Sequence, residues 1–219
     1  MAPIRVLVVD DHAVFCEALA NILRLEADIE VVGMGHSVDD AVRSAHALTP
    51  DVVLLDVHMG DGSGVDATAA IKTNRPETQV VILTSDEDES VLKAAVQAGV
   101  TGYLSKHEPA ALVVQAVRSA ARGEALIAPY MLARLLKGSQ TPQLIPNTSP
   151  LTPRELAVLI ELSLGHDNAT VARNLRMSPN TVRTHVQNIL SKLNVHSKLE
   201  AVSKAVREGW VEIPHQPAA

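Results

Sequence analysis

Aromatic residues and cysteine are scarce in this sequence of 219 residues. Phe, Trp and Tyr together make up 2% of it, so a hydrophobic core must be built from Val, Leu, Ile and Ala. The single cysteine, Cys16, cannot form an internal disulfide, which fits a reducing compartment. The sequence also has no basic-plus-apolar leader at its N-terminus and no apolar run of about 18 residues. These absences predict a cytoplasmic protein that is neither secreted nor inserted in a membrane.

Charge is distributed unevenly along the chain. Residues 1–128 contain 9 Lys and Arg against 19 Asp and Glu, a net charge of −10. Residues 129–219 contain 10 against 6, a net charge of +4. Two solvated domains of unlike charge would show the same pattern, but only the second part is suited to approach DNA.

The first 125 residues alternate short apolar runs with helical periodicity. Strands are expected at 4–9, 29–34, 51–55, 79–83 and 101–104, and helices at 12–25, 38–48, 64–74, 88–98 and 109–122. The apolar character of the strands is nearly continuous, which is typical of a parallel sheet covered on both faces. We therefore predict that residues 1–125 form an α/β domain with a doubly wound, five-stranded parallel sheet.

The rest of the chain is predicted to be helical. One helix is expected at 129–137 and a flexible linker rich in Pro, Ser, Thr and Asn at 138–150, so that residues 126–150 join two domains. Four helices are expected at 153–164, 168–175, 179–193 and 197–208, and two of them begin with a capping residue followed by proline. These patterns predict a small all-α domain over 151–212, followed by a tail at 213–219.

Acidic residues stand where the predicted strands end. Asp10 and Asp11 follow the first strand, and Asp56 follows the third. If these strands are neighbours, three carboxylates converge at the carboxyl edge of the sheet, where parallel sheets collect ligands. Such crowding needs a cation, and oxygen ligands suit Mg²⁺. Thr84, at the end of the fourth strand, and Lys106, after the fifth, are expected to lie nearby.

Together these side chains could handle a phosphoryl group. Asp56 would be the nucleophile, Mg²⁺ and Lys106 would neutralise the phosphoryl oxygens, and Thr84 would donate a hydrogen bond to one of them. Each residue also has a plain structural explanation, since an Asp pair can cap a helix, a threonine can be structural and a lysine can be solvated. Their occurrence together at strand ends favours the functional interpretation.

The ordered segments VLVVDDH, VVLLDVHM, VVILTS and GYLSK resemble the receiver domain of bacterial two-component response regulators over residues 4–122. The resemblance implies a flavodoxin-like fold, with Asp56 as phosphoacceptor for a sensor histidine kinase. It implies that Asp10, Asp11, Asp56 and the backbone carbonyl of His58 hold Mg²⁺. It also implies that Thr84 and Tyr103 form a switch pair, in which Tyr103 turns inward after phosphorylation.

Two positions depart from the receiver pattern. Gly60 stands where many receivers have proline, so the loop GDGSG is expected to be more mobile. His107 follows Lys106 where proline is frequent.

The segment SPNTVRTHVQNILSKL at 178–193 is amphipathic. One face carries Val182, Val186, Ile189, Leu190 and Leu193, and the other carries Arg183, Thr184, Gln187, Asn188, Ser191 and Lys192 without an acid. Such a polar face suits the major groove of DNA, with the helix at 168–175 crossing the backbone as in a helix-turn-helix. An ordinary amphipathic helix with a solvated face is the alternative.

Residues 151–209 are similar to the four-helix LuxR-type DNA-binding domain through LTPRELAVL, NATVARNL, SPNTVRTHVQNILSKL and HSKLEAV. The resemblance implies base contacts by Arg183, Thr184 and Gln187. It implies phosphate contacts to double-stranded DNA by Asn180, Thr181, Asn188, Lys192 and Lys198. Val202, Ala205 and Val206 could form a dimer contact or close the domain's own core.

The whole chain resembles the NarL/FixJ class of response regulators, which implies a DNA-binding transcription regulator that forms a homodimer when phosphorylated. Two alternatives belong to other classes. A phosphohydrolase with an aspartyl-phosphate intermediate usually has an acid two residues after the nucleophile, where this chain has His58. A DNA-binding module without phosphorylation would show a degenerate acidic pocket. We therefore predict a regulator and not an enzyme.

Overall fold

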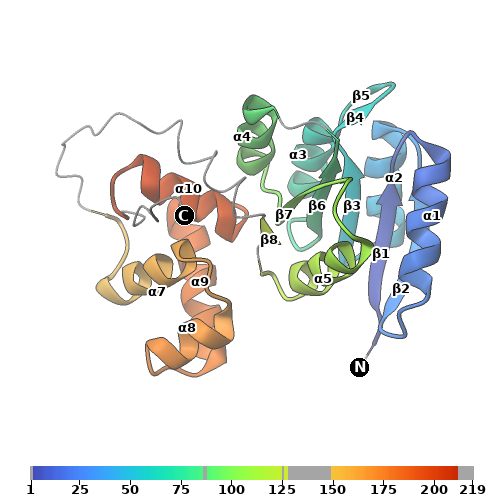
Figure 1. Ribbon diagram of the computed structural model, residues 1–219. Helices are drawn as coiled ribbons and strands as arrows, with labels where there is room; N and C mark the ends of the chain where they lie inside the picture. The colour runs from blue at the N-terminus through green and yellow to red at the C-terminus, as the bar shows by residue number, and fades with distance from the viewer. Residues whose placement is uncertain (1, 86–87, 125, 128–148, 212–219) are drawn as a thin grey trace, which may run out of the picture. The chain divides into compact units, whose positions relative to one another are not determined.

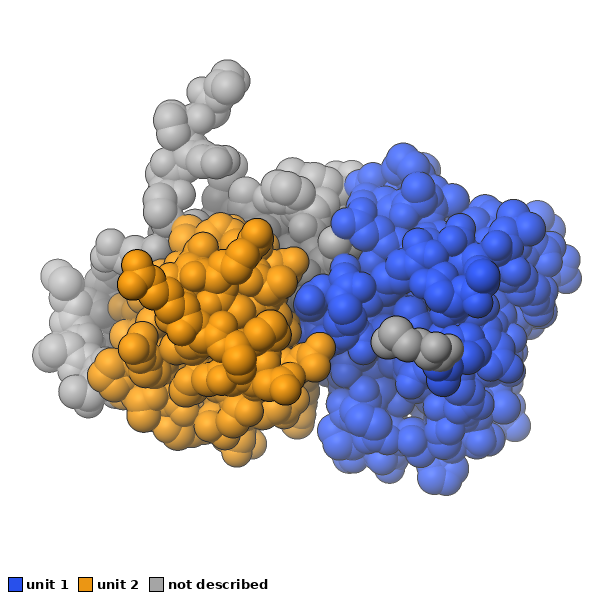
Figure 2. Space-filling model, turned by 90° about the horizontal axis from the view of Figure 1, so that it is seen from below, with its two compact units in different colours: residues 1–132 blue, residues 133–219 orange. Residues whose placement is uncertain are grey.

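The computed structural model describes residues 2–85, 88–124, 126–127 and 149–211. The chain divides into two compact units, residues 1–132 and 133–219 (Figure 2). Each unit is described by itself. Among the described residues, every helix is too short or too polar to cross a membrane. The predicted helix at 129–137, residues 138–148 of the predicted linker and the tail at 213–219 lie outside the described residues.

A parallel sheet forms the centre of the first unit (Figure 1). Its strands are β1 (Ile4–Val9), β2 (Ile29–Gly35), β3 (Val52–Asp56), β6 (Gln79–Thr84), β7 (Gly102–Ser105) and β8 (Leu126–Ile127). They lie in the order β2-β1-β3-β6-β7-β8. The first five strands confirm the predicted five-stranded sheet. The sixth, β8, was not predicted, because two residues are too few to show a periodicity; it pairs in parallel with β7.

The strand order explains why ligands would collect at one edge. Strand order reverses at β1, since β2 lies on one side of it and β3 on the other. In such sheets the crevice at the carboxyl ends of the strands is the usual binding place. Every residue of β3 is buried, as expected for a strand covered on both faces.

Helices cover both faces of the sheet (Figure 1). One face carries α1 (Ala13–Arg24) and α5 (Ala110–Ala121), which contact each other. The other face carries α2 (Val38–Leu48), α3 (Gly64–Asn74) and α4 (Glu89–Gln97). The core between α1, α5 and the sheet consists of aliphatic side chains such as Leu23, Leu54 and Val117, joined by Cys16. The prediction of an aliphatic core is therefore confirmed.

The second unit is a helical domain, as predicted. Its helices are α7 (Pro153–Ser163), α8 (Asn168–Asn174), α9 (Pro179–Leu193) and α10 (Lys198–Arg207). Each begins at a capping side chain that accepts a hydrogen bond from a backbone N–H, and α7 has a full capping box between Thr152 and Glu155. Gly165 and Gly209 end α7 and α10 with φ of 81° and 70°, which favours glycine.

Candidate functional site

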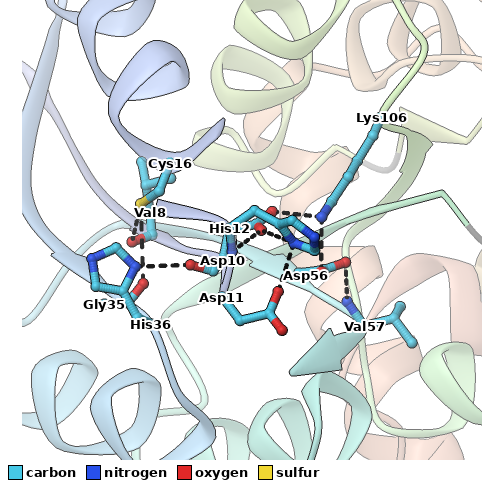
Figure 3. Close-up of polar contacts among 10 residues, drawn as sticks. All are labelled: Val8, Asp10, Asp11, His12, Cys16, Gly35, His36, Asp56, Val57 and Lys106. Carbon is cyan, nitrogen blue, oxygen red and sulfur yellow. Dashed lines mark hydrogen bonds and ion pairs between the residues drawn. The ribbon is translucent and has the colours of Figure 1, made fainter. Parts of the chain in front are cut away.

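The predicted acids meet at the carboxyl edge of the first unit's sheet. Asp10 directly follows β1, and Asp56 is the last residue of the neighbouring β3. Both side chains are buried, with 2% and 4% of each residue exposed, whereas Asp11 is more accessible. Figure 3 shows the three carboxylates gathered in one place. We call this place, made of Asp10, Asp11, Asp56 and Lys106, the acidic pocket.

Lys106 bridges the two buried acids. Its Nζ lies 2.7 Å from Asp10 Oδ2 and 2.8 Å from Asp56 Oδ2 (Figure 3). The backbone N–H of Lys106 donates to Thr84 O at the end of β6, so the turn after β7 fixes where the side chain begins. The ammonium also lies 5.0 Å from the centre of the Phe15 ring. The ammonium of Lys106 therefore forms ion pairs with two buried carboxylates.

The electrostatics of the pocket show an excess of negative charge. Burial raises the pKa of Asp56, and the nearby charge of Asp10 acts in the same direction, although Lys106 opposes both. Burial disfavours the charged form of Lys106, but its hydrogen bonds to Asp10 and Asp56 outweigh this effect and raise its pKa. An ion pair alone would lower the pKa of Asp56. The pKa of Asp56 rises because burial disfavours the ionised carboxylate, and the charge of Asp10 adds to this effect.

The donor atoms of the pocket fit a divalent cation. One ligand atom from each of Asp10, Asp11, His12 and Asp56 can be chosen so that all four lie within 4.8 Å of one another. Three of these residues supply carboxylate oxygens, which are the hard ligands that Mg²⁺ prefers. The excess negative charge described above would be offset by such an ion.

Backbone contacts hold Asp56 in place. Asp56 Oδ1 accepts a hydrogen bond of 2.8 Å from Val57 N, and Val57 O accepts one of 2.7 Å from Gly64 N. A Cβ on Gly64 would lie only 1.9 Å from the backbone oxygen of Asp56. Helix α3 thus begins directly against the end of β3, at a distance that only glycine permits. No sequence pattern distinguishes Gly64 from Gly60 and Gly62, the other glycines of this loop.

The loop after Asp56 is anchored to α2. His58 and Met59 form β4, Gly62 and Ser63 form β5, and the two strands pair antiparallel. Asp61 Oδ1 accepts a hydrogen bond of 2.9 Å from Val38 N at the beginning of α2. The loop thus forms a hairpin with a contact to α2, and the greater mobility expected from Gly60 in place of proline stays a prediction. Asp61 was also missed, because its partner is 23 residues away in the sequence.

The predicted switch residues lie on adjacent strands. Thr84 is the last residue of β6 and Tyr103 belongs to β7, and each is 1% exposed. The ring of Tyr103 is thus already buried in this structure. In the sheet, β7 lies between β6 and β8. The inward turn of Tyr103 after phosphorylation stays a prediction.

In the second unit, α9 has the predicted two faces. Val182, Val186, Ile189 and Leu193 are buried in the core of this unit. The residues predicted to contact bases or phosphates on α9 are all exposed: Asn180, Thr181, Arg183, Thr184, Gln187, Asn188 and Lys192. Lys198, in the first turn of α10, is half-buried. The exposed face therefore offers the donors and acceptors that base edges require.

Several of these polar side chains have partners within the domain. Lys192 Nζ lies 2.7 Å from Glu155 Oε2, and Lys198 Nζ donates to Asn168 Oδ1 at 2.9 Å. Glu155 is buried, and burial alone would raise its pKa. The hydrogen bonds from Lys192 and Thr152 outweigh burial and hold the pKa of Glu155 below its usual range. This network ties the beginning of α7 to the last turn of α9.

Three residues of α10 were predicted either to form a dimer contact or to close the core of their own domain, and the structure decides this for two of them. Val202 and Ala205 are 5% and 0% exposed and belong to the core of the second unit, while Val206 is half-buried. Val202 and Ala205 therefore close the domain's own core.

Comparison with known proteins assigns both units. The family model described as "Response regulator receiver domain" matches residues 6–118. The model described as "Bacterial regulatory proteins, luxR family" matches residues 149–205. The chain is a response regulator.

Two of the relatives described here align with nearly the whole of this response regulator, and a third aligns with its receiver domain. The response regulator protein VraR of Staphylococcus aureus is 36% identical over 213 residues, which are 95% of this chain and 99% of VraR. The crystal structure of the response regulator ChrA, from a heme-sensing two-component system, is 31% identical and covers 96% of this chain and 100% of ChrA, with a TM-score of 0.53. The receiver domain of NarL from Mycobacterium tuberculosis is 31% identical and covers 57% of this chain and 100% of that domain, with a TM-score of 0.55.

The response regulator therefore combines a receiver domain with a LuxR-type DNA-binding domain and acts as a regulator of transcription in a two-component system. The acidic pocket lies in the receiver domain, and the polar face of α9 lies in the DNA-binding domain.

His12, which lies beside the acidic pocket, was not predicted as a site residue from the sequence, like Gly64 and Asp61. Its position directly after two acidic residues was the only signal available.

Proposed function

We propose that Asp56 accepts a phosphoryl group from a sensor histidine kinase and that phosphorylation controls dimerisation and DNA binding. The observation that carries this proposal is the contact of Lys106 with both Asp10 and Asp56, beside the accessible Asp11. It provides a nucleophilic carboxylate next to a fixed positive charge.

In the proposed transfer, a carboxylate oxygen of Asp56 forms a bond to phosphorus while the phosphorus–nitrogen bond of the kinase's phosphohistidine breaks. The bonding electron pair stays on the leaving imidazole. Asp56 needs no general base when it is ionised. Lys106 would move its ammonium from the carboxylate to the phosphoryl oxygens, and the Val57 N–H keeps the other carboxylate oxygen oriented. Thr84 would donate its hydroxyl proton to a phosphoryl oxygen.

Asp10, Asp11, Asp56 and the backbone carbonyl of His58 are the residues we expect to hold Mg²⁺. When bound, this ion would neutralise negative charge on the phosphoryl oxygens. The pocket supports this assignment through its donor set and through its formal charge, since three carboxylates lie beside one ammonium.

The signal would pass through Thr84, which ends β6, and Tyr103, which is the second residue of the adjacent strand β7. A shift of Thr84 toward the phosphoryl group would change the packing around Tyr103 and bias the surface formed by 86–108 between two states. A homodimer formed in this way would place two DNA-binding domains on two half-sites.

For DNA binding we propose base contacts by Arg183, Thr184 and Gln187. Phosphate contacts are assigned to Asn180, Thr181, Asn188, Lys192 and Lys198. The exposure of this face supports the assignment. Lys192 would contact phosphate while staying close to Glu155, so it contributes less charge than a free lysine.

The proposed domain boundaries are 1–125 for the receiver, 126–150 for a helix and linker, 151–212 for the DNA-binding domain and 213–219 for a tail. A cytoplasmic, non-enzymatic role follows from the proposed function, because the partners are DNA and a kinase. The family assignment favours this role over phosphohydrolase activity.

Labelling by a small phosphodonor tests the proposal. Acetyl phosphate should phosphorylate the wild-type chain and Asp66→Asn, a matched change at an exposed acid of α3, but not Asp56→Asn. Labelling that persists in Asp56→Asn would reject Asp56 as the acceptor. Catalytic release of phosphate from sugar phosphates would favour the hydrolase, and DNA affinity unchanged by beryllofluoride would favour an unregulated DNA-binding module.

A further inference from the structure

His12 is the N-cap residue of α1, but its side chain does not cap the helix. A residue at the N-cap normally accepts a hydrogen bond through its side chain, and Ser, Thr, Asp and Asn are preferred there. Within the described part of the chain, the His12 side chain makes no cap hydrogen bond. Its ring is turned instead toward the carboxylates of the acidic pocket (Figure 3).

The ring nitrogen lies at distances that suit a shared ion. His12 Nδ1 is 2.8 Å from Asp11 Oδ1 and 3.3 Å from Asp10 Oδ1. Two ligands that each bind an ion at about 2.1 Å lie roughly 3 Å apart in tetrahedral or octahedral geometry. The four donor atoms from His12 and the three acids already lie within 4.8 Å of one another. Small side-chain rotations would therefore complete a ligand set of one nitrogen and three oxygens.

Lys106 and His12 use different oxygens of the pocket. Lys106 contacts the Oδ2 atoms of Asp10 and Asp56, whereas His12 contacts the Oδ1 atoms of Asp10 and Asp11. An ion on the His12 side would thus not need to displace the ammonium. The His12 side chain is also 73% exposed, so an ion can reach it from solvent.

A second histidine near the pocket has another task. His36 Nδ1 lies 2.9 Å from the backbone oxygen of Asp10, on the side away from the carboxylates (Figure 3). The His36 ring therefore supports the backbone that carries Asp10, whereas the His12 ring faces the carboxylate oxygens of Asp10 and Asp11.

We infer that His12 supplies a nitrogen ligand to the acidic pocket, so that the pocket binds divalent transition metals such as Zn²⁺ or Ni²⁺ more tightly than Mg²⁺. The inference rests on the proposed metal site of the receiver domain. Mg²⁺ favours oxygen ligands and keeps several waters, while imidazole suits Zn²⁺, Ni²⁺ and Cu²⁺. A transition metal would then compete with Mg²⁺ at the phosphorylation site and regulate the response regulator through its metal content.

The test compares Zn²⁺ and Mg²⁺ binding to the full chain and to His12→Asn by titration calorimetry. Asparagine is a preferred N-cap residue, so this change removes the imidazole without weakening the start of α1. We expect Zn²⁺ affinity to fall by about tenfold or more, as for loss of a metal-supporting residue, and Mg²⁺ affinity to change by less than about threefold. His46→Ala, at an exposed histidine in the last turn of α2, should change neither.

A second readout reports the bond directly. In a chain with ¹⁵N-labelled histidine, Zn²⁺ should shift one imidazole resonance, and His12→Asn should remove that resonance. The inference is wrong if His12→Asn leaves Zn²⁺ affinity unchanged or weakens Zn²⁺ and Mg²⁺ equally. Neither result touches the proposed function, which fails separately if Asp11→Asn leaves the binding of both ions unchanged or if Asp56→Asn is still phosphorylated.

Discussion

Replacing Gly64 by alanine should damage the proposed phosphorylation site through the backbone alone. The new Cβ would lie 1.9 Å from the backbone oxygen of Asp56, 3.0 Å from its carbonyl carbon and 3.2 Å from the Cα of Val57. All three neighbours are backbone atoms at the end of β3, so no flexible side chain can move aside. Ordinary van der Waals contact begins at 3.4 Å, so the start of α3 and the end of β3 must separate by about 1.5 Å (3.4 − 1.9).

The cost can be estimated from two contributions. Overpacking in a close-packed region costs about 1–3 kcal/mol. The required separation would also break or stretch the hydrogen bond of 2.7 Å from Gly64 N to Val57 O, which adds about 1 kcal/mol. The sum is a loss of about 2–4 kcal/mol in the free energy of unfolding of the receiver domain. At roughly 4 °C per kcal/mol, its melting temperature should fall by about 8–16 °C.

The neighbouring Gly60 provides a matched control. A Cβ on Gly60 would meet no atom within 4 Å, and its φ is not positive. Gly60→Ala should therefore be neutral or stabilise the domain by about 0.4–1 kcal/mol, because alanine restricts the unfolded chain. The two variants change the same residue type in the same loop, four positions apart.

Thermal unfolding of the full chain, followed by circular dichroism, measures the stability difference, and acetyl phosphate labelling measures the site. Gly64→Ala should be less stable and label more slowly, since the Asp56 backbone is displaced. Gly60→Ala should be at least as stable as the wild type and should label at the same rate. If Gly64→Ala melts within about 2 °C of the wild type and labels at the same rate, the close approach does not constrain the site.

Three further predictions concern other contacts. Arg183→Ala should cost roughly 1–3 kcal/mol at a specific site in gel-shift titrations; an equal loss on unrelated DNA would make Arg183 a backbone contact. Glu155→Gln should lower the stability of the DNA-binding domain by about 1–3 kcal/mol at neutral pH, measured by urea unfolding. Because the pKa of Glu155 is lowered in the folded state, this stabilisation is present above the unfolded pKa and lost as the pH falls through the folded value, so wild type and variant should converge in acid. Asp61→Ala should cost about 1 kcal/mol by removing a hydrogen-bond acceptor from Val38 N and should weaken Mg²⁺ binding in calorimetry, since the hairpin that carries His58 loses its anchor; unchanged Mg²⁺ affinity would show that the anchor is dispensable.

The regular elements could be predicted because they depend on local patterns. Continuous apolar runs predicted the buried strands, and capping residues followed by proline predicted the starts of α7 and α9. The convergence of Asp10 and Asp56 also followed from sequence, because both stand at carboxyl ends of parallel strands that turn out to be neighbours. Each of these predictions uses information held within about ten residues of the position concerned.

The contacts that the sequence did not predict join segments that are distant along the chain. Asp61 reaches Val38, and Lys192 reaches the buried Glu155, 37 residues away. From the sequence we predicted that Lys192 contacts a DNA phosphate, but we did not predict its ion pair with Glu155 within the domain. β8, which pairs with Tyr103 of β7, was missed because it is too short to produce a pattern.

The loop GDGSG shows why a site predicted from sequence leaves its geometry open. Gly60 and Gly64 are the same residue in the same loop, and sequence composition treats both as sources of mobility. In the structure, one meets no neighbouring atom where a Cβ would stand, and the other lets a helix begin against the backbone of Asp56. The difference arises because Gly64 begins α3 and its N–H donates to Val57 O, whereas Gly60 lies in the hairpin between β4 and β5. The contrast between Gly60→Ala and Gly64→Ala therefore measures how far tertiary packing, and not loop composition, fixes the position of Asp56.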